Sequence, residues 1–251
     1  MVRAGGLVAR AAPLVGVLGA ALVLSACGAS PAPLGPAGTD ELVIPTPSPD
    51  PTDFPGGTSN AWFPLAPGTR WLYRQYTVSG NRRVDARVLP EARQIEGVAT
   101  TALEWTVRER GRTSVVMTRW YAVDRSGNVW WFGQRNGAGP TLDRLARRSW
   151  LAGRRGAEAG VVLTARPREG DGYFNARLPR VVERRSTVTG LDGTVATTTR
   201  TYHHAVVTAD RSTLAPLDDV QSFYERGIGL VAQQDTTSTS TSLALLRMSR
   251  G

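Results

Sequence analysis

The sequence predicts a mainly β protein: one curved or partly closed antiparallel sheet domain with little helix. Runs of alternating apolar and polar residues recur from Trp71 to Met248, as they do in half-buried strands. These runs are rich in Val, Thr, Trp and Tyr, which favour strands, and clusters of Gly, Asn, Asp and Pro separate them. Only residues 140–148 show apolar spacing that suits two turns of helix.

The first 26 residues have the organisation of a secretory signal peptide. Arg3 and Arg10 precede a run without charge, residues 11–26, which ends in small side chains. A transmembrane helix needs about 20 apolar residues, and this run is shorter and contains Pro13. We therefore predict that residues 1–26 are removed. An ordinary secreted protein would carry a similar leader, so the residue that follows is decisive.

That residue is Cys27, the only cysteine of the chain. The stretch Leu24-Ser25-Ala26-Cys27 resembles the lipobox of bacterial lipoproteins. The resemblance implies cleavage before Cys27, a diacylglyceryl thioether on its sulfur and acylation of the new amino terminus, with palmitate as a typical chain. It thereby implies a protein anchored by lipid in the cell membrane, on the extracytoplasmic face. An acylated Cys27 also leaves no thiol for a disulfide, for catalysis or for metal binding.

Residues 27–59 are predicted to be a disordered tether. They are rich in Pro, Gly, Ser and Thr, with alternating prolines at residues 45–51. Such a segment buries too little apolar surface to fold and tends toward the extended polyproline II conformation. We place the β-rich extracytoplasmic domain at residues 60–251.

The chain has a net charge of +9 at neutral pH. Its positive charges are those of 30 arginines, because the sequence contains no lysine. Complete use of arginine indicates a bacterium with a GC-rich genome. The arginine clusters lie near predicted turns, where they form either a solvated face or a surface that attracts anionic lipids or wall polymers. The compartment and the absence of a recognisable motif argue against nucleic acid as a partner.

About ten strands are expected in the domain. A turn cluster, Asp124 to Asn128, separates two of them and predicts a hairpin. Residues 213–219 are expected to form a loop. The strands are predicted at residues 71–76, 83–88, 101–109, 113–123, 129–133, 173–178, 181–189, 195–208, 220–224, 229–236 and 239–248.

Three phrases of the domain, WFPLAPGTRWLY at 62–73, YAVDRSGNVWWFG at 121–133 and FYERGIGLV at 223–231, resemble a known group. That group of uncharacterised bacterial secreted proteins and lipoproteins has an FPLxPGTxWxY start, a DxxGNVWxFG hairpin and a YxxGxGLV close. Arg226 departs from the pattern, which often has proline there. The resemblance implies a β-rich extracellular domain and brings no catalytic residue with it.

The sequence offers no set of residues suited to catalysis or metal binding. His203 and His204 are neighbours in a predicted strand, so their side chains should point to opposite faces. The turn at 124–128 lacks the ligand pattern of a calcium loop, and no Gly-x-Ser-x-Gly motif occurs. Asp218-Asp219 is a carboxylate pair without an evident partner. We predict a protein that is not an enzyme and that uses no cofactor and no metal.

The aromatic residues are the remaining indication of function. All seven tryptophans lie after residue 60, and Trp130 and Trp131 are adjacent, so that one ring can enter the core while the other faces outward or into a cavity. These rings either build an ordinary core or line a ligand-binding concavity. The candidate ligand-binding residues are Trp71, Tyr73, Trp130 and Trp131.

The favoured hypothesis is a membrane-anchored lipoprotein that acts as a non-enzymatic binding module for a lipid or another amphipathic envelope molecule. Its partners would be the membrane, through Cys27, and a lipid or anionic envelope ligand. A cell-surface structural protein that contacts wall polymer or a protein partner is the alternative. A wall-glycan hydrolase is the least favoured, because it needs two converging carboxylates.

Overall fold

The computed structural model describes residues 49–137, 149–214, 219–236 and 241–251. The signal peptide, Cys27, the predicted helix at 140–148 and Asp218 all lie outside these residues. The described residues contain no α-helix, and a single 3₁₀ turn, Pro51–Asp53, precedes the strands. The prediction of a mainly β protein with little helix is confirmed.

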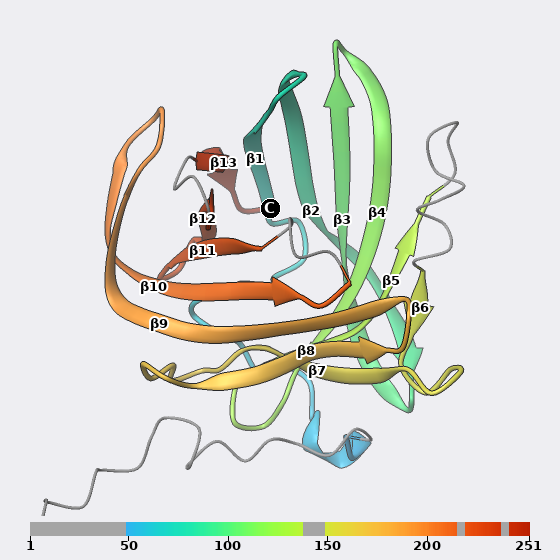
Figure 1. The fold of residues 1–251 in the computed structure, drawn as a ribbon. Helices are drawn as coiled ribbons and strands as arrows, with labels where there is room; N and C mark the ends of the chain where they lie inside the picture. The colour runs from blue at the N-terminus through green and yellow to red at the C-terminus, as the bar shows by residue number, and fades with distance from the viewer. Residues whose placement is uncertain (1–48, 138–148, 215–218, 237–240) are drawn as a thin grey trace, which may run out of the picture. The chain divides into compact units, whose positions relative to one another are not determined.

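Thirteen strands follow, several of them longer than the sequence predicted (Figure 1). They are β1 Arg70–Thr77, β2 Gly80–Ile95, β3 Val98–Glu109, β4 Arg112–Val123, β5 Val129–Asn136, β6 Trp150–Leu151, β7 Glu158–Leu163, β8 Gly172–Leu178, β9 Val182–Ala196, β10 Thr201–Ser212, β11 Val220–Glu225, β12 Gly229–Asp235 and β13 Thr241–Ser249.

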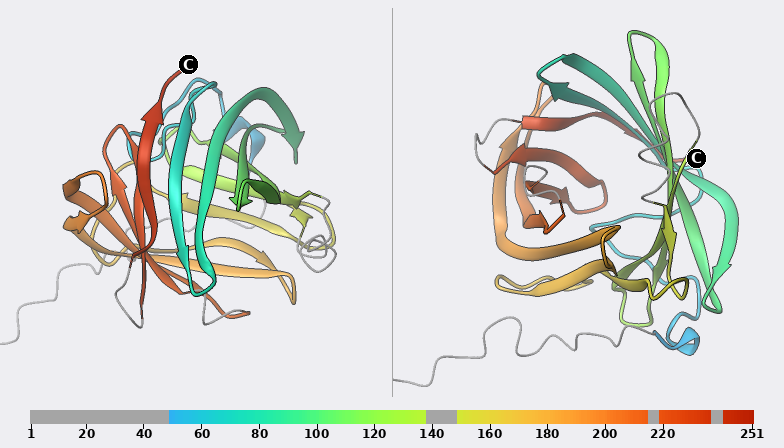
Figure 2. Two further views of the ribbon diagram at one scale, coloured as in Figure 1. Left: turned by 90° about the horizontal axis from the view of Figure 1, so that it is seen from above. Right: turned by 45° about the vertical axis from the view of Figure 1, so that its right-hand side comes forward.

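The strands form one closed antiparallel sheet in which neighbours along the chain are neighbours in space. From β1 to β5 and from β7 to β13 each strand pairs with the next, and β5 pairs with β7. The short β6 lies beside β7 along the same edge of β5. The last strand pairs with the first, from Arg70 opposite Ser249 to Gln75 opposite Leu243, and this pairing closes the sheet (Figure 2). Closure satisfies the backbone groups that an open edge would leave unpaired.

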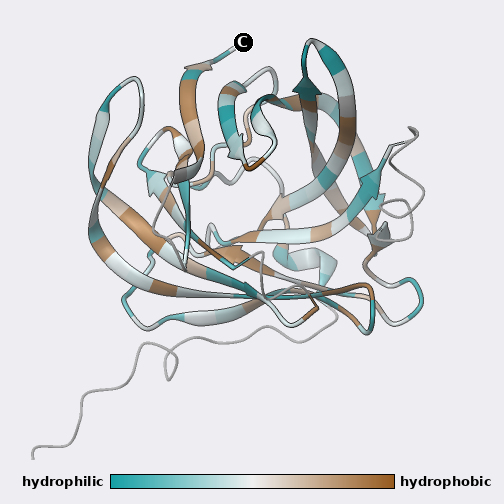
Figure 3. Ribbon diagram, turned by 45° about the horizontal axis from the view of Figure 1, so that its top comes forward, coloured by the Kyte–Doolittle hydropathy of each residue, from teal (hydrophilic) through white to brown (hydrophobic). Residues whose placement is uncertain are grey.

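The alternation read from the sequence decides which side chains face inward. In β1, Trp71 and Tyr73 are buried while their neighbours are more exposed, and Val84, Ala86 and Val88 do the same in β2. Figure 3 shows apolar and polar bands alternating along the strands. The inner face of the sheet is therefore the apolar core.

The turns predicted from glycine and proline occur where expected. Thr69 N–H donates to the carbonyl of Ala66, and Gly68 has a φ of 81°, as the third residue of a type II turn requires. Gly127, with a φ of 85°, closes the hairpin between β4 and β5. Gly229 also has a positive φ and lies next to a shift in register between β11 and β12.

Several local expectations differ from the structure, and the strands β6 and β7 have no counterpart among the predicted ones. The predicted strand at 195–208 is two strands, because a turn at 197–200 separates β9 from β10; in it Thr197 N–H donates to the carbonyl of Arg200. The run of threonines that favours a strand also supplies the hydroxyl that stabilises the turn, since Thr197 Oγ1 bonds to the same carbonyl.

The end of the segment predicted as a tether contacts the sheet. The Phe54 ring lies edge-on to Trp130 and Phe132, with centroids 5.8 and 5.4 Å apart. The backbone N–H of Arg125 donates to the carbonyl of Asp53 at 2.7 Å. Packing against the sheet therefore begins before Asn60, because the Phe54 side chain, although it lies among prolines, packs its ring against apolar side chains of the sheet.

Candidate ligand-binding cavity

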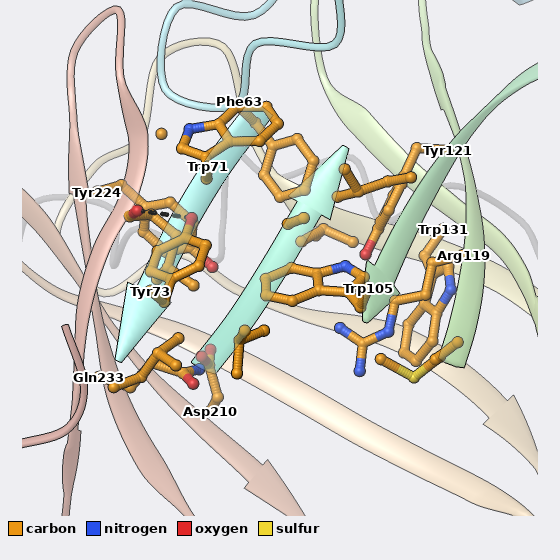
Figure 4. Close-up of a pocket in the computed structure, with 18 of the residues that line it drawn as sticks. Phe63, Trp71, Tyr73, Trp105, Arg119, Tyr121, Trp131, Asp210, Tyr224 and Gln233 are labelled. Atoms are coloured by element: carbon orange, nitrogen blue, oxygen red, sulfur yellow. Dashed lines mark hydrogen bonds between the residues drawn. The ribbon is translucent and has the colours of Figure 1, made fainter. Parts of the chain in front are cut away.

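The closed sheet surrounds a cavity of about 370 Å³. This volume lies within the range of small-molecule sites, about 300–1,000 Å³. Aromatic and aliphatic side chains supply most of its lining, and a group of polar side chains supplies the rest. Figure 4 labels ten of the lining residues: Phe63, Trp71, Tyr73, Trp105, Arg119, Tyr121, Trp131, Asp210, Tyr224 and Gln233.

The aromatic wall is built by β1 and β3. The Tyr73 and Trp105 rings are stacked, with centroids 5.7 Å apart and an angle of 15° between their planes. Trp71 Nε1 donates to the carbonyl of Ile228 at 2.7 Å, and the Tyr73 hydroxyl donates to that of Leu230 at 3.0 Å. The polar atoms of Trp71 and Tyr73 are already hydrogen-bonded to backbone carbonyls. These two residues can therefore offer a ligand only the apolar surfaces of their rings.

The segment before β1 adds Phe63 to the lining. The side chain of Asn60 fixes this segment: its Oδ1 accepts from the backbone N–H groups of Trp62 and Phe63, and its Nδ2 donates to the carbonyl of Gly127. The Phe63 ring then lies 5.0 Å from that of Tyr121. The Phe-Pro motif near the start of the domain thus covers part of the interior.

Arg119 brings a positive charge to the cavity. Its guanidinium carbon lies 5.0 Å from the centre of the Trp131 ring and 5.9 Å from that of Trp105, and its Nε donates to Gln134 Oε1 at 2.9 Å. Contact with two indole faces stabilises the cation and holds it at the aromatic wall. An anionic group on a ligand would find its counter-charge here.

The opposite side of the cavity carries a buried carboxyl, that of Asp210. Ser186 and Thr208 hydroxyls lie 2.6 and 2.8 Å from Asp210 Oδ1, and the Ser222 hydroxyl bonds to Oδ2. Burial raises the pKa of Asp210, against the hydrogen bonds from these hydroxyls and the charge of Arg184, which lower it. Asp210 therefore holds a proton more readily than an exposed aspartate.

The hydrogen bonds of Ser186 also favour a protonated Asp210. Its hydroxyl lies 2.6 Å from Asp210 Oδ1 and 3.0 Å from Asn175 Oδ1, and both oxygens are acceptors when the carboxyl is ionised. One hydroxyl hydrogen serves only one of them. A protonated Asp210 removes the conflict, because it donates to Ser186 while Ser186 donates to Asn175.

An Asp210→Asn variant tests this arrangement. A carboxyl whose pKa is raised by folding stabilises the protein below its unfolded pKa, about 3.9, and that contribution is lost as the pH rises through the folded pKa. The variant should therefore gain stability relative to the wild type between pH 4 and 8, by about 1.4 kcal/mol for each unit of the raised pKa. Urea unfolding measures the difference. A difference that stays flat with pH would contradict the assignment.

The structure brings three of the four predicted ligand-binding residues together. Trp71, Tyr73 and Trp131 line the cavity. Trp130 does not: its ring packs against Phe54, and its Nε1 donates to Asp124 Oδ2 at 2.9 Å. Both indoles are buried, because the segment before β1 covers the outer one.

Several lining residues were missed in the sequence. Trp105, Arg119, Tyr121 and Asp210 all belong to the cavity wall. The spacing by two of Leu103, Trp105 and Val107 could have indicated the inward side of β3. Nothing in the sequence around Asp210 indicated that its carboxyl would be buried.

The remaining candidates have structural roles or are exposed. The side chains of His203 and His204 are both exposed, since a bulge in β10 breaks the alternation of facing there. Asp124 accepts from Asn128 and Trp130, so its carboxylate serves the hairpin. Asp219 accepts from the backbone N–H of Ser212. Among the described residues, no three His, Cys, Asp or Glu side chains gather closely enough to hold a metal.

Within the described part of the chain there is also no helix long and apolar enough to span a membrane. The fold and the cavity define the class of protein: an up-and-down closed sheet with a mainly apolar interior cavity and a buried polar group on the opposite wall.

Comparison with known proteins places the chain in no established family. No family model and no curated protein matches it. Two solved structures are similar, one from Bacteroides fragilis, named as an exported protein with a YmcC-like fold, and one from Parabacteroides distasonis, named as a lipoprotein. The first has 13% identity and a TM-score of 0.42, over 76% of this chain and 100% of that one. The second has 12% identity and a TM-score of 0.37, over 76% and 99%. Similarity at this level carries no argument about function.

Proposed function

We propose that this protein is a membrane-anchored extracytoplasmic binding module that holds an amphipathic molecule inside its closed sheet. The observation that carries the proposal is the cavity of about 370 Å³ with stacked rings on one wall and Asp210 with its hydroxyl partners on another. Apolar ring surface suits a hydrocarbon or ring system, and the polar groups suit a hydroxyl or carbonyl. Arg119 adds a counter-charge for an acidic group.

The anchored location rests on the sequence of the first 27 residues. The leader and Cys27 support export and lipidation, and a lipid-anchored binding protein works where amphipathic molecules are present. We include non-enzymatic binding in the proposal because the described lining contains one carboxyl group, that of Asp210, which already forms hydrogen bonds with three hydroxyls. A wall-glycan hydrolase would need a second carboxylate across the cavity.

Two measurements test the proposal. Native mass spectrometry of the protein purified from its own membrane should show a co-purifying amphipathic molecule, released on unfolding. A brominated fatty acid added to delipidated protein should quench tryptophan fluorescence, because Trp71, Trp105 and Trp131 line the cavity.

Adjacent tryptophans provide the matched control. Trp131→Phe should remove part of the quenching, whereas Trp130→Phe should leave the quenched signal intact, since Trp130 lies on the other face of β5. Absence of a co-purifying molecule together with no quenching, or equal effects of the two variants, would overturn the proposal.

A further inference from the structure

Three arginines form an uninterrupted row across the outer face of β1, β2 and β3. Arg74 lies directly opposite Arg83, and Arg83 directly opposite Arg108. Directly opposed residues share one face of a sheet, and the inward residues Tyr73, Val84 and Val107 flank the row in sequence. We call these three residues the arginine row.

The arginine row lacks the acidic partners that its neighbours have. Arg70 pairs with Asp85, and Arg87 lies opposite Glu104 and pairs with it at 3.7 Å. None of the three side chains of the arginine row forms an ion pair with another described residue. Like charges directly opposite each other destabilise a sheet, so the row costs folding stability that an anionic partner would repay.

The hairpin tips beside the row extend the surface. Arg110 lies in the turn between β3 and β4 and lines a groove on the outer face, in which arginines outnumber acidic residues by four (Arg70, Arg83, Arg108 and Arg110) to one (Asp85). Among the described residues, Val78, in the turn between β1 and β2, is the most exposed large apolar side chain, at 112%. Both tips project from the same end of the sheet (Figure 1). The basic surface formed by these arginines therefore lies next to an exposed apolar side chain, that of Val78.

We propose that this surface docks onto an anionic lipid bilayer, with the arginine row on the phosphates and Val78 in the interface. Guanidinium groups bind phosphate oxygens in pairs, which suits lipid headgroups. The exposed apolar side chain favours a bilayer over a hydrated wall polymer, because only the bilayer offers Val78 an apolar surrounding. The cavity lies directly behind the row, so docking places it next to the membrane. This inference does not depend on what the cavity binds.

A fluorescent label at the tip tests the docking. Val78→Cys in the mature chain, residues 27–251 with Cys27→Ala, has residue 78 as its only thiol and carries neither the leader nor an acyl anchor. A nitrobenzoxadiazole label there should brighten and shift to the blue with vesicles containing about 30% phosphatidylglycerol, and it should stay unchanged with neutral vesicles. Salt at about 0.5 M should reverse the change.

The arginine row is then removed by Arg74→Gln, Arg83→Gln and Arg108→Gln together. Each of the three arginines is expected to contribute the energy typical of a basic residue near an anionic membrane. Their joint removal should therefore lower the binding constant for anionic vesicles about 100-fold. The control is the same substitution at Arg154, Arg155 and Arg180, which are exposed and lie in other turns; it should keep most of the response. Equal loss in both variants, a response to neutral vesicles, or binding of soluble polyphosphate without a response to anionic vesicles would overturn the proposal.

Discussion

A Gly160→Ala variant is expected to lose a large part of its folding stability. A Cβ atom at Gly160, in β7, would lie 2.1 Å from the carbonyl oxygen of Phe174 and 2.8 Å from its carbon. Both atoms are backbone, so no side chain can rotate to make room. Overpacked cores typically lose 1–3 kcal/mol through adjustable side chains, and a backbone clash should exceed about 3 kcal/mol. That is a large part of the 5–15 kcal/mol by which a domain of this kind is stable.

The same substitution at Gly190, in β9, is the matched control. There the nearest atom to a new Cβ is a methyl group of Val207 at 3.9 Å, and the backbone has no positive φ. Urea unfolding followed by circular dichroism should show Gly190→Ala close to the wild type and Gly160→Ala unfolded or strongly destabilised. Equal stability of the two variants would mean that β7 and β8 do not approach as closely as described.

The close approach at Gly160 also serves the cavity. Next to it, the register of β8 against β9 shifts between Phe174 and Ala176, and Asn175 lies in that bulge. Asn175 Nδ2 donates to the carbonyl of Val161 at 2.8 Å, which turns its Oδ1 toward Ser186. A side chain at residue 160 would therefore disturb the polar wall as well as the fold.

An Ala86→Trp variant is expected to weaken ligand binding about 100-fold while the sheet still forms. Ala86 faces inward on β2, directly opposite Trp71 on one side and Trp105 on the other, and it lines the cavity. An indole there would occupy the space beside the two rings. Losing about 100 Å² of apolar contact weakens binding by about 2.5 kcal/mol, close to 100-fold. Titration with the brominated fatty acid measures the effect.

Ala99→Trp, on an exposed position of β3, is the control for the same change in size. Its affinity should equal that of the wild type. The unfolding midpoint of Ala86→Trp should be measured beside it, so that lost binding is separated from lost structure. A folded Ala86→Trp protein that binds with unchanged affinity would show that the ligand lies outside the cavity.

The local features of the fold could be read from the sequence because they depend on near neighbours. Trp71 and Tyr73 alternate with Leu72 and Arg74, and this period of two sets the facing of β1 before any partner strand is known. The turn at Gly127 follows from the freedom of glycine to take a positive φ. The same reasoning failed at 195–208, where one composition favours both a strand and a turn.

The cavity needed contacts between distant parts of the chain. The alternation of strand positions predicts that the Trp130 and Trp131 side chains face opposite sides of the sheet. It does not predict which of the two faces the interior. That was decided by Phe54, which covers the outer ring, and by Arg119, which lies over the inner one. The polar wall is formed by Ser186, Asp210 and Ser222, which belong to three different strands. No local sequence pattern predicts that these side chains lie together.

The sequence by itself determined the strand-rich domain, the direction in which individual side chains face, several of the turns and the signals that predict export and lipidation. Only the tertiary structure decided that β13 returns to β1 and closes the sheet, that a cavity remains inside, and that three arginines align outside it. The reason is physical: alternation and turn geometry are set within a few residues, whereas closure and register are set by the packing of the whole sheet.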